Sequence, residues 1–171
     1  AAGKFPDVKA GYPVGKMDVD VQARVYAMIE NVDDNVGRLV AWLRDSKLAE
    51  NTLVIWMTDN GRATPGYNAG LRGTKSTVYE GGIRSPFFAW WPGTLQPGEA
   101  SDRIAAHLDL TPTILDFCGI KPPAGHKFDG RSLRPLLERL EIAWPERTLF
   151  TQSHRGDQPV QYHNFAVRTQ K

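Results

Sequence analysis

The sequence lacks several features that would have fixed its class at once. It has a single cysteine, Cys118, so no disulfide can form within the chain. No apolar run approaches the ~20 residues of a membrane-spanning helix, and the N-terminal stretch AAGKFPDVKAGYPVGK lacks the apolar core of a signal peptide. Basic and acidic side chains nearly balance, 21 against 19. We therefore expect no membrane span and no nucleic-acid partner, because nucleic-acid binders usually carry a basic stripe.

The chain is long enough for one domain with a hydrophobic core, since 41% of its 171 residues are hydrophobic. Residues 1–18 are rich in glycine and proline and predict a loop or an extended arm. Asp18 can cap a helix that starts at Val19 and ends near Ser46 after about seven turns. Its apolar positions recur at steps of three and four: Val25, Met28, Ile29, Val32, Val36, Leu39, Val40 and Leu43.

Two continuous apolar runs predict strands. Residues 53–57 (LVIWM) and 86–91 (PFFAWW) fit strands buried on both faces. Residues 60–82 between them predict a loop with one helical turn, and residues 104–106 a short third strand. A long helix that leads into such a strand favours an α/β sheet covered by helices.

The rest of the chain predicts two helices and a hairpin. Thr111 and Pro112 can start a helix that runs through Cys118, and Ser132 can cap another that runs through Leu140. Residues 148–152 and 165–168 predict two short strands separated by a polar loop. These strands would begin a small separate sheet.

A carboxylate and an amide, Asp59 and Asn60, follow the first predicted strand. Ligands bind beyond the carboxyl ends of strands in α/β sheets, and hard oxygens suit Ca²⁺ or Mg²⁺. The sequence Asp-Asn-Gly is also a common turn, and two oxygens fall short of the six to eight that calcium takes. Lys75, set among glycines, suits an oxyanion or is a solvated loop lysine. These residues alone favour the turn and the solvated lysine, with the ligand site as the alternative.

Other candidates favour structural roles. Cys118 lies on a short apolar helix, which favours a packed core thiol over a nucleophile. The adjacent Asp33 and Asp34 favour a solvated helix face. His107 at a helix entrance favours capping or packing, and Glu80 favours a contact that ties down its own glycine loop. The polar loop also holds His154, Arg155, His163 and Asn164, for which lining a substrate pocket is the minor alternative.

Several motifs in one order carry a family resemblance. They are TDNG (58–61), LRGTKSTVYEGGIRSP (71–86), WPG (91–93) and LDLTPTILDFCGI (108–120). IENVDDNVGRL (29–39) and FDGRSLRPLL (128–137) support them on either side. From about residue 20 to residue 171 the chain resembles the C-terminal part of the sulfatase family, within the alkaline phosphatase superfamily.

The resemblance implies a fold and a site. The fold would be α/β, part of an alkaline-phosphatase-like sheet flanked by helices, with the start of a small C-terminal sheet. Residues 1–18 would be an arm, residues 19–145 the C-terminal part of the sulfatase α/β domain, and residues 146–171 the beginning of the C-terminal subdomain. In the family the positions of Asp59 and Asn60 bind calcium and that of Lys75 contacts the sulfate ester. The nucleophile is a formylglycine made from the cysteine or serine of C/S-x-P/A-x-R.

The chain departs from this pattern because it contains no C/S-x-P/A-x-R. The family's other metal aspartates and its helper histidine also have no counterpart. We therefore expect a fragment that is inactive alone and has a partial calcium site. Its exposed apolar surface would either cause self-association or be covered by a helix or by an arm such as residues 1–18. One alternative is a phosphomonoesterase or phosphodiesterase of the same superfamily. Another is a non-catalytic fragment or binding module.

Overall fold

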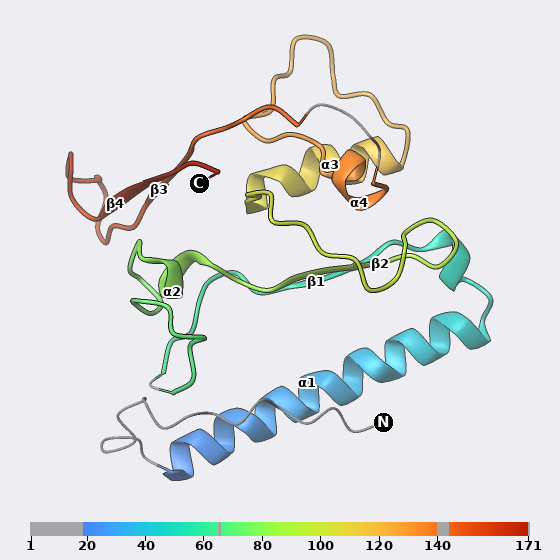
Figure 1. The fold of residues 1–171 in the computed structure, drawn as a ribbon, viewed down its shortest axis with the longest axis horizontal. Helices are drawn as coiled ribbons and strands as arrows, with labels where there is room; N and C mark the ends of the chain where they lie inside the picture. Colours follow the sequence, from blue (N-terminus) through green and yellow to red (C-terminus); the bar gives the residue numbers. More distant parts are fainter. Residues whose placement is uncertain (1–18, 65, 140–143, 171) are drawn as a thin grey trace.

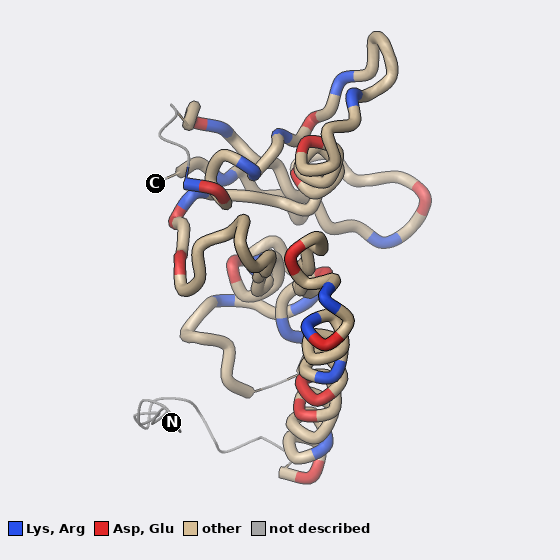
Figure 2. Tube along the Cα trace, turned by 90° about the vertical axis from the view of Figure 1, so that its right-hand side faces the viewer, with Lys and Arg blue, Asp and Glu red and all other residues tan. Residues whose placement is uncertain are grey.

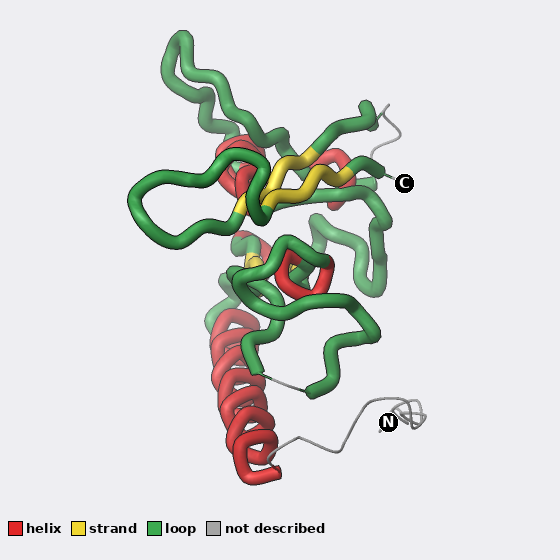
Figure 3. Tube along the Cα trace, turned by 90° about the vertical axis from the view of Figure 1, so that its left-hand side faces the viewer, coloured by secondary structure: helices red, strands yellow, loops and turns green. Residues whose placement is uncertain are grey.

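The computed structural model describes residues 19–64, 66–139 and 144–170. In order, the elements are α1 (Val19–Asp45), the 3-10 turn η2 (Ala49–Asn51), β1 (Val54–Met57), α2 (Glu80–Ile83), β2 (Phe87–Trp90), η3 (His107–Asp109), α3 (Leu110–Phe117), α4 (Arg134–Leu137), β3 (Leu149–Gln152) and β4 (Phe165–Arg168). Figure 1 shows α1 along one edge, with the other helices and strands on one side of it. Loops make up much of the chain between them, as Figure 3 shows.

The long first helix is confirmed, with an end within one residue of the prediction. The expected cap Asp18 lies outside the described residues. Arg44 in the last turn of α1 faces the negative end of the helix dipole and lies over the Trp90 ring, 5.5 Å from its centroid. Figure 2 shows both signs of charge interspersed along this helix, so its surface carries no field of one sign.

The first two strands form where the apolar runs predicted them, but they are not fully buried. β1 and β2 pair antiparallel, with Val54 opposite Trp90 and Met57 opposite Phe87. Every residue of β1 is half-buried, and Phe88 on β2 is 63% exposed. The expectation of burial on both faces is therefore wrong for this chain, because among the described residues the two strands form a two-stranded ribbon. Residues 104–106 are not a strand either, and Ile104 N instead donates to Gln170 Oε1.

The predicted hairpin near the C-terminus is confirmed as β3 and β4, which pair antiparallel from Leu149 opposite Arg168 to Gln152 opposite Phe165. The two predicted helices also form, with different ends. α3 begins one residue before Thr111 and is preceded by η3, so Thr111 is not its cap. α4 is a single turn, and Leu140 lies outside the described residues.

A buried polar hub joins η3, α3 and the chain that leads into β3. Asp109 is 0% exposed, and both its carboxylate oxygens lie 2.8 Å from Arg147 Nη1. The same carboxylate accepts from the backbone N–H of Ala106 at 2.8 Å and of Arg131 at 2.9 Å. A buried charge is tolerated when it is paired and hydrogen-bonded in this way. The motif LDLTPT therefore places a fully satisfied carboxylate in the interior.

Thr113, which is also 0% exposed, extends this hub. Its hydroxyl donates to Asp109 O at 2.5 Å and accepts from Leu133 N at 2.9 Å. Gly130 packs against the same turn, because a Cβ there would lie 2.0 Å from Leu108 O. The sequence FDGRSL therefore supplies a glycine that lets two backbones touch.

Apolar surface outweighs apolar core in the described residues. Leu43, Ala49 and Leu133 are the buried apolar side chains among them. Large exposed side chains on α1 are Val19, Val21, Tyr26, Met28, Ile29, Val32, Leu39 and Trp42. This exposed surface was expected, whereas self-association stays a prediction. Among the described residues no helix is long and apolar enough to span a membrane.

Candidate functional site

The candidate site lies where β1 ends. Thr58, Asp59 and Asn60 follow Met57 directly, and the Thr58 hydroxyl donates to Asn60 O at 3.1 Å, which closes the chain into a tight bend. Gly61 N then donates to Gly82 O at 2.8 Å. The bend is thus fastened to α2, at the far end of the loop that contains Lys75.

The side chains of this bend are left available for a ligand. Asp59 is exposed, and its carboxylate has no hydrogen-bond or ion-pair partner within the part of the chain that the structure describes. Asn60 donates through Nδ2 to Gly61 O at 2.8 Å, which leaves Oδ1 without a protein donor among the same residues. One carboxylate and one amide oxygen fit the donor set that calcium takes.

These oxygens supply only part of a calcium shell. Among the described residues there is no cluster of three or more His, Cys, Asp or Glu side chains that could hold a metal ion. Asp59 and Asn60 provide fewer oxygens than the six to eight of a calcium site. The remaining ligands would have to come from outside the described residues.

Lys75 is presented on a tight turn. Thr77 N donates to Thr74 O at 3.0 Å, so Lys75 and Ser76 are the central residues of this turn. Ser76 has φ +71°, the left-handed conformation that the third position of a type II turn requires and that glycine or asparagine usually fills. Lys75 is exposed, and its ammonium group has no partner among the described residues.

The backbone brings the Lys75 turn back to the end of β1. Lys75 N donates to Arg62 O at 2.7 Å, and Arg62 follows Asn60 after a single glycine. The sequence could only indicate that the loop had enough glycines to fold back, whereas the structure supplies the hydrogen bond. Convergence of the Asp59, Asn60 and Lys75 side chains on one ligand stays a prediction.

Glycines allow the close backbone contacts within this loop. A Cβ at Gly61 would lie 2.0 Å from Gly81 O, and one at Gly81 would lie 2.2 Å from Gly73 O. Real Cβ atoms do not approach backbone oxygens so closely. The glycines at these positions therefore serve a packed, ordered loop.

His107 contacts the same strand end, which the sequence did not reveal. Its Nε2 lies 3.1 Å from Thr58 O, the carbonyl just before Asp59. Sequence reasoning favoured capping or packing at the helix entrance, but the ring is exposed and reaches across to a residue 49 positions away. No local pattern could have shown this contact.

The β3–β4 hairpin also contacts the loop that contains Lys75. Ser153 Oγ and Asn164 Nδ2 both donate to Ser76 O, at 3.3 and 3.4 Å. Glu80 forms an ion pair with Arg168 on β4. The sequence favoured a contact of Glu80 with its own glycine loop, whereas the structure shows that Glu80 links this loop to the hairpin. His154, Arg155 and His163 lie exposed in the loop between these anchors.

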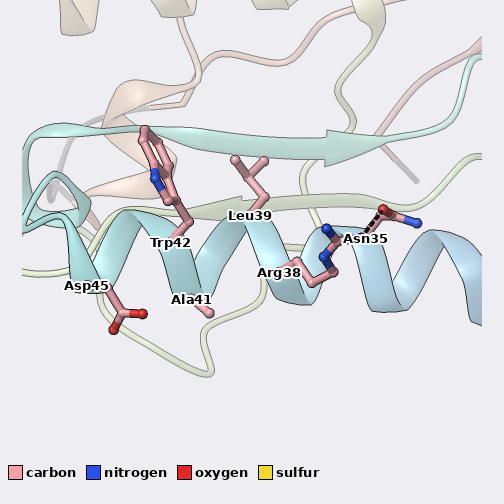
Figure 4. Close-up of a pocket in the computed structure, with 6 residues that line it drawn as sticks. All are labelled: Asn35, Arg38, Leu39, Ala41, Trp42 and Asp45. Carbon is pink, nitrogen blue, oxygen red and sulfur yellow. Dashed lines mark hydrogen bonds between the residues drawn. The ribbon is translucent and has the colours of Figure 1, made fainter.

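Two features of the surface lie apart from this site. Cys118 is exposed, so the expectation of a packed core thiol is wrong. Figure 4 shows an open groove on α1 where Leu39 and Trp42 point toward the strands. The groove is lined by Asn35, Arg38, Leu39, Ala41, Trp42 and Asp45, none of which belongs to the candidate site.

Comparisons with known proteins agree with this fold. One relative, N-acetylgalactosamine-6-sulfatase of Sus scrofa, is 38% identical over 128 residues, which are 71% of this chain and 24% of the relative. The solved structure of Ps i-CgsB in complex with k-i-k-neocarrahexaose has a TM-score of 0.68 at 30% identity, over 75% of this chain and 29% of that one. The structure of BT4656 with its substrate D-glucosamine-2-N,6-O-disulfate has a TM-score of 0.66 at 27% identity, over 83% of this chain and 28% of that one.

These matches confirm the predicted fold class, a partial α/β fold of the alkaline-phosphatase-like type. The chain spans about a quarter of the length of the curated relative described above. The family profile for the C-terminal region of N-sulphoglucosamine sulphohydrolase matches residues 73–171, and the sulfatase profile matches residues 4–120. Because the latter match covers more than half of the sequence, the chain belongs to the sulfatase family.

Proposed function

We propose that this chain forms one wall of the active site of a longer sulfatase, called the full-length protein below. Asp59 and Asn60 would bind calcium, and Lys75 would contact the sulfate ester. The observation that carries this proposal is the set of polar groups around the end of β1 that lack protein partners within the described residues. Polar groups left unpaired on an otherwise ordered loop are available to a ligand.

The substrate we propose is a sulfated saccharide. One relative is an N-acetylgalactosamine-6-sulfatase, and two similar structures hold neocarrahexaose or a glucosamine disulfate. All three names specify a saccharide, and two of them, the galactosamine sulfatase and the glucosamine disulfate, also specify sulfate on the sugar. Which sugar this protein takes would depend on loops around the site, because a sulfate group alone does not distinguish one saccharide from another.

The proposed chemistry assigns a separate task to each side chain. Calcium, when bound, would supply positive charge to the sulfate oxygens. Asp59 would hold the metal with its carboxylate and Asn60 with its amide oxygen. The Lys75 ammonium would stabilise the negative charge that grows on the ester oxygen as the bond to sulfur breaks. The nucleophile would come from outside this chain, which contains no C/S-x-P/A-x-R, so the isolated chain would not turn over substrate.

Replacing Lys75 tests this proposal. In the full-length protein, Lys75→Ala should lower kcat for a sulfated sugar by about 100-fold or more, the effect typical of losing one preorganised charge-stabilising group. Lys121→Ala is the matched control, since Lys121 is an exposed loop lysine remote in sequence from the site. Equal activity of the two variants would contradict the role of Lys75. A full-length protein that prefers phosphate esters would instead favour the phosphoesterase alternative.

A further inference from the structure

We propose that the β3–β4 hairpin is a positioning element for the sulfate-binding lysine. This inference rests on the proposed role of Lys75 and goes beyond it, because it assigns a function to residues about 80 positions further along the chain. The residues that carry it are Ser153 and Asn164, which flank the hairpin loop. Neither has a role in the proposed chemistry.

The contacts converge on one carbonyl group. Ser153 Oγ and Asn164 Nδ2 donate to Ser76 O, and Asn164 Nδ2 also donates to Ser153 O at 2.8 Å. Ser153 N donates to Asn164 O at 3.0 Å, which continues the β3–β4 ladder by one pair. The two donors are therefore held together by the hairpin itself.

The carbonyl that they hold belongs to the residue after Lys75. Ser76 has a left-handed φ without being glycine, a conformation that costs free energy and persists only when the surroundings hold it. The hairpin donors are part of those surroundings, and Lys75 N on Arg62 O fixes the other side of the turn. The position of the ammonium group thus depends on hydrogen bonds from two distant segments.

A second contact joins the hairpin to the point where the same loop ends and α2 begins. Glu80 starts α2 and forms an ion pair with Arg168 on β4. The hairpin therefore contacts the loop at two positions, Ser76 and Glu80, both of which follow Lys75 in the sequence. Two contacts with the same loop restrict its movement more than one contact would, so the Glu80 ion pair supports the hydrogen bonds to Ser76 O in holding the Lys75 turn.

The test is a pair of conservative and non-conservative changes in the full-length protein. The double variant Ser153→Ala with Asn164→Ala removes both donors to Ser76 O. It should lower kcat/KM for a sulfated sugar by about tenfold or more, since displacement of a catalytic group by 1 Å can cost 100-fold. Ser153→Thr keeps a hydroxyl and should retain most of the activity. Thr148→Ala, just before β3, is the matched control on the same hairpin.

The outcomes separate the two claims. If Lys75→Ala abolishes turnover and the double variant matches Thr148→Ala, the hairpin does not position the lysine. If Lys75→Ala itself has no effect, the proposed function fails first. If the double variant loses activity only in proportion to a lowered unfolding temperature, and Ser153→Thr does not rescue it, a purely structural role replaces the proposal.

An independent contact supports a second inference, that His107 is a positioning residue for the calcium ligands. This inference also rests on the proposed function. The ring Nε2 lies 3.1 Å from Thr58 O, and the next residue is Asp59. His107 belongs to η3, whose last residue Asp109 is fully buried and paired with Arg147. His107 thus connects the buried Asp109–Arg147 pair to the peptide group that precedes Asp59, the proposed calcium ligand.

Calcium affinity of the full-length protein, measured by calorimetry, tests this second inference. His107→Ala should weaken calcium binding by about 10- to 100-fold, as loss of a residue that orients metal ligands usually does. His107→Gln retains an N–H donor and should restore most of the affinity. His154→Ala, an exposed histidine in the hairpin loop, is the control.

Each result decides one claim. Unchanged calcium affinity in His107→Ala would overturn the positioning role, provided that the unaltered protein binds calcium. Absence of calcium binding by the unaltered full-length protein would overturn the proposed metal site itself. A Gln variant as weak as the Ala variant would show that the N–H donor is not what matters.

Discussion

Two carboxylates of this chain lie in opposite surroundings. Asp109 is completely buried, and its oxygens accept from Arg147 and from two backbone N–H groups. Asp59 is exposed and has no partner among the described residues. Both belong to motifs shared with the sulfatase family. Family resemblance alone therefore does not say which aspartate holds the fold and which one serves the ligand.

The environment separates the two roles. A buried carboxylate must be fully paired, because an unpaired buried charge is very costly. Asp109 therefore has no free oxygen to offer a ligand. Asp59 remains in water, where an unpaired carboxylate costs little, so it can exchange water for a metal ion. The comparison predicts that equal substitutions in the two regions should have unequal consequences.

The largest expected effect follows from Asp109→Asn. The change removes the negative charge and leaves Arg147, whose side chain is only 9% exposed, without its counter-ion. Burial, and then the positive charge of Arg147, lower the pKa of the neighbouring Arg131, whereas the charge of Asp109 raises it. Removing that charge would therefore leave two arginines close together without the carboxylate that offsets their repulsion. The free energy of unfolding should fall by about 3–5 kcal/mol, as measured when one partner of a buried pair is removed. Denaturant unfolding of the full-length protein is the measurement, and a loss below about 1 kcal/mol would show that the hub is dispensable.

Gly61→Ala should have the next largest effect, because it disturbs the loop that carries Asp59, Asn60 and Lys75. The new Cβ would lie 2.0 Å from Gly81 O, so two backbones must separate. We expect a loss of about 1–3 kcal/mol, typical of overpacking, together with weaker substrate binding. Gly37→Ala in α1 is the control, for which we expect the free energy of unfolding to rise and not to fall. Nothing lies within 4 Å of its Cβ, and alanine should stabilise the helix by up to about 1 kcal/mol.

Much of the fold was predictable because its signals are local. Residues 53–57 and 86–91 are short apolar runs between glycines and polar residues, and both contain a strand. α1 follows from an apolar repeat over many turns. The pattern could not show that β1 and β2 would pair only with each other among the described residues, since burial depends on what lies beside a strand.

The site was only partly predictable for the same reason. Asp59, Asn60 and Lys75 are found by their motifs, but their supports come from distant positions. The contact of His107 with Thr58 spans 49 residues, and that of Asn164 with Ser76 spans 88. Neither histidine nor asparagine follows a pattern that predicts such a partner. Long-range hydrogen bonds of this kind require the structure.

Asp59→Asn makes the same chemical change as Asp109→Asn in the other region and should give a smaller, purely functional effect. Unfolding free energy should change by no more than about 0.5 kcal/mol, as for most exposed substitutions. Calcium affinity of the full-length protein should fall by about tenfold or more, because loss of an anionic oxygen weakens a calcium site. Asp129→Asn, on another exposed loop, should change neither quantity. A large loss of stability in Asp59→Asn would erase the contrast between the two carboxylates.

The smallest expected effect belongs to Cys118→Ser, which lies in neither region. Cys118 caps the C-terminal end of α3, and its backbone N–H donates to Ile114 O at 3.0 Å, a bond that serine keeps. Its thiol is exposed, so the change fills no cavity and empties none. Unfolding free energy should shift by no more than about 0.5 kcal/mol, and turnover of the full-length protein should stay unchanged. The native chain should also react with a thiol reagent without denaturant, since access and thiolate character control that reaction. If the thiol reacts only after unfolding, Cys118 is covered in the full-length protein. A part of that protein outside this chain would then bury the thiol, as the sequence had favoured.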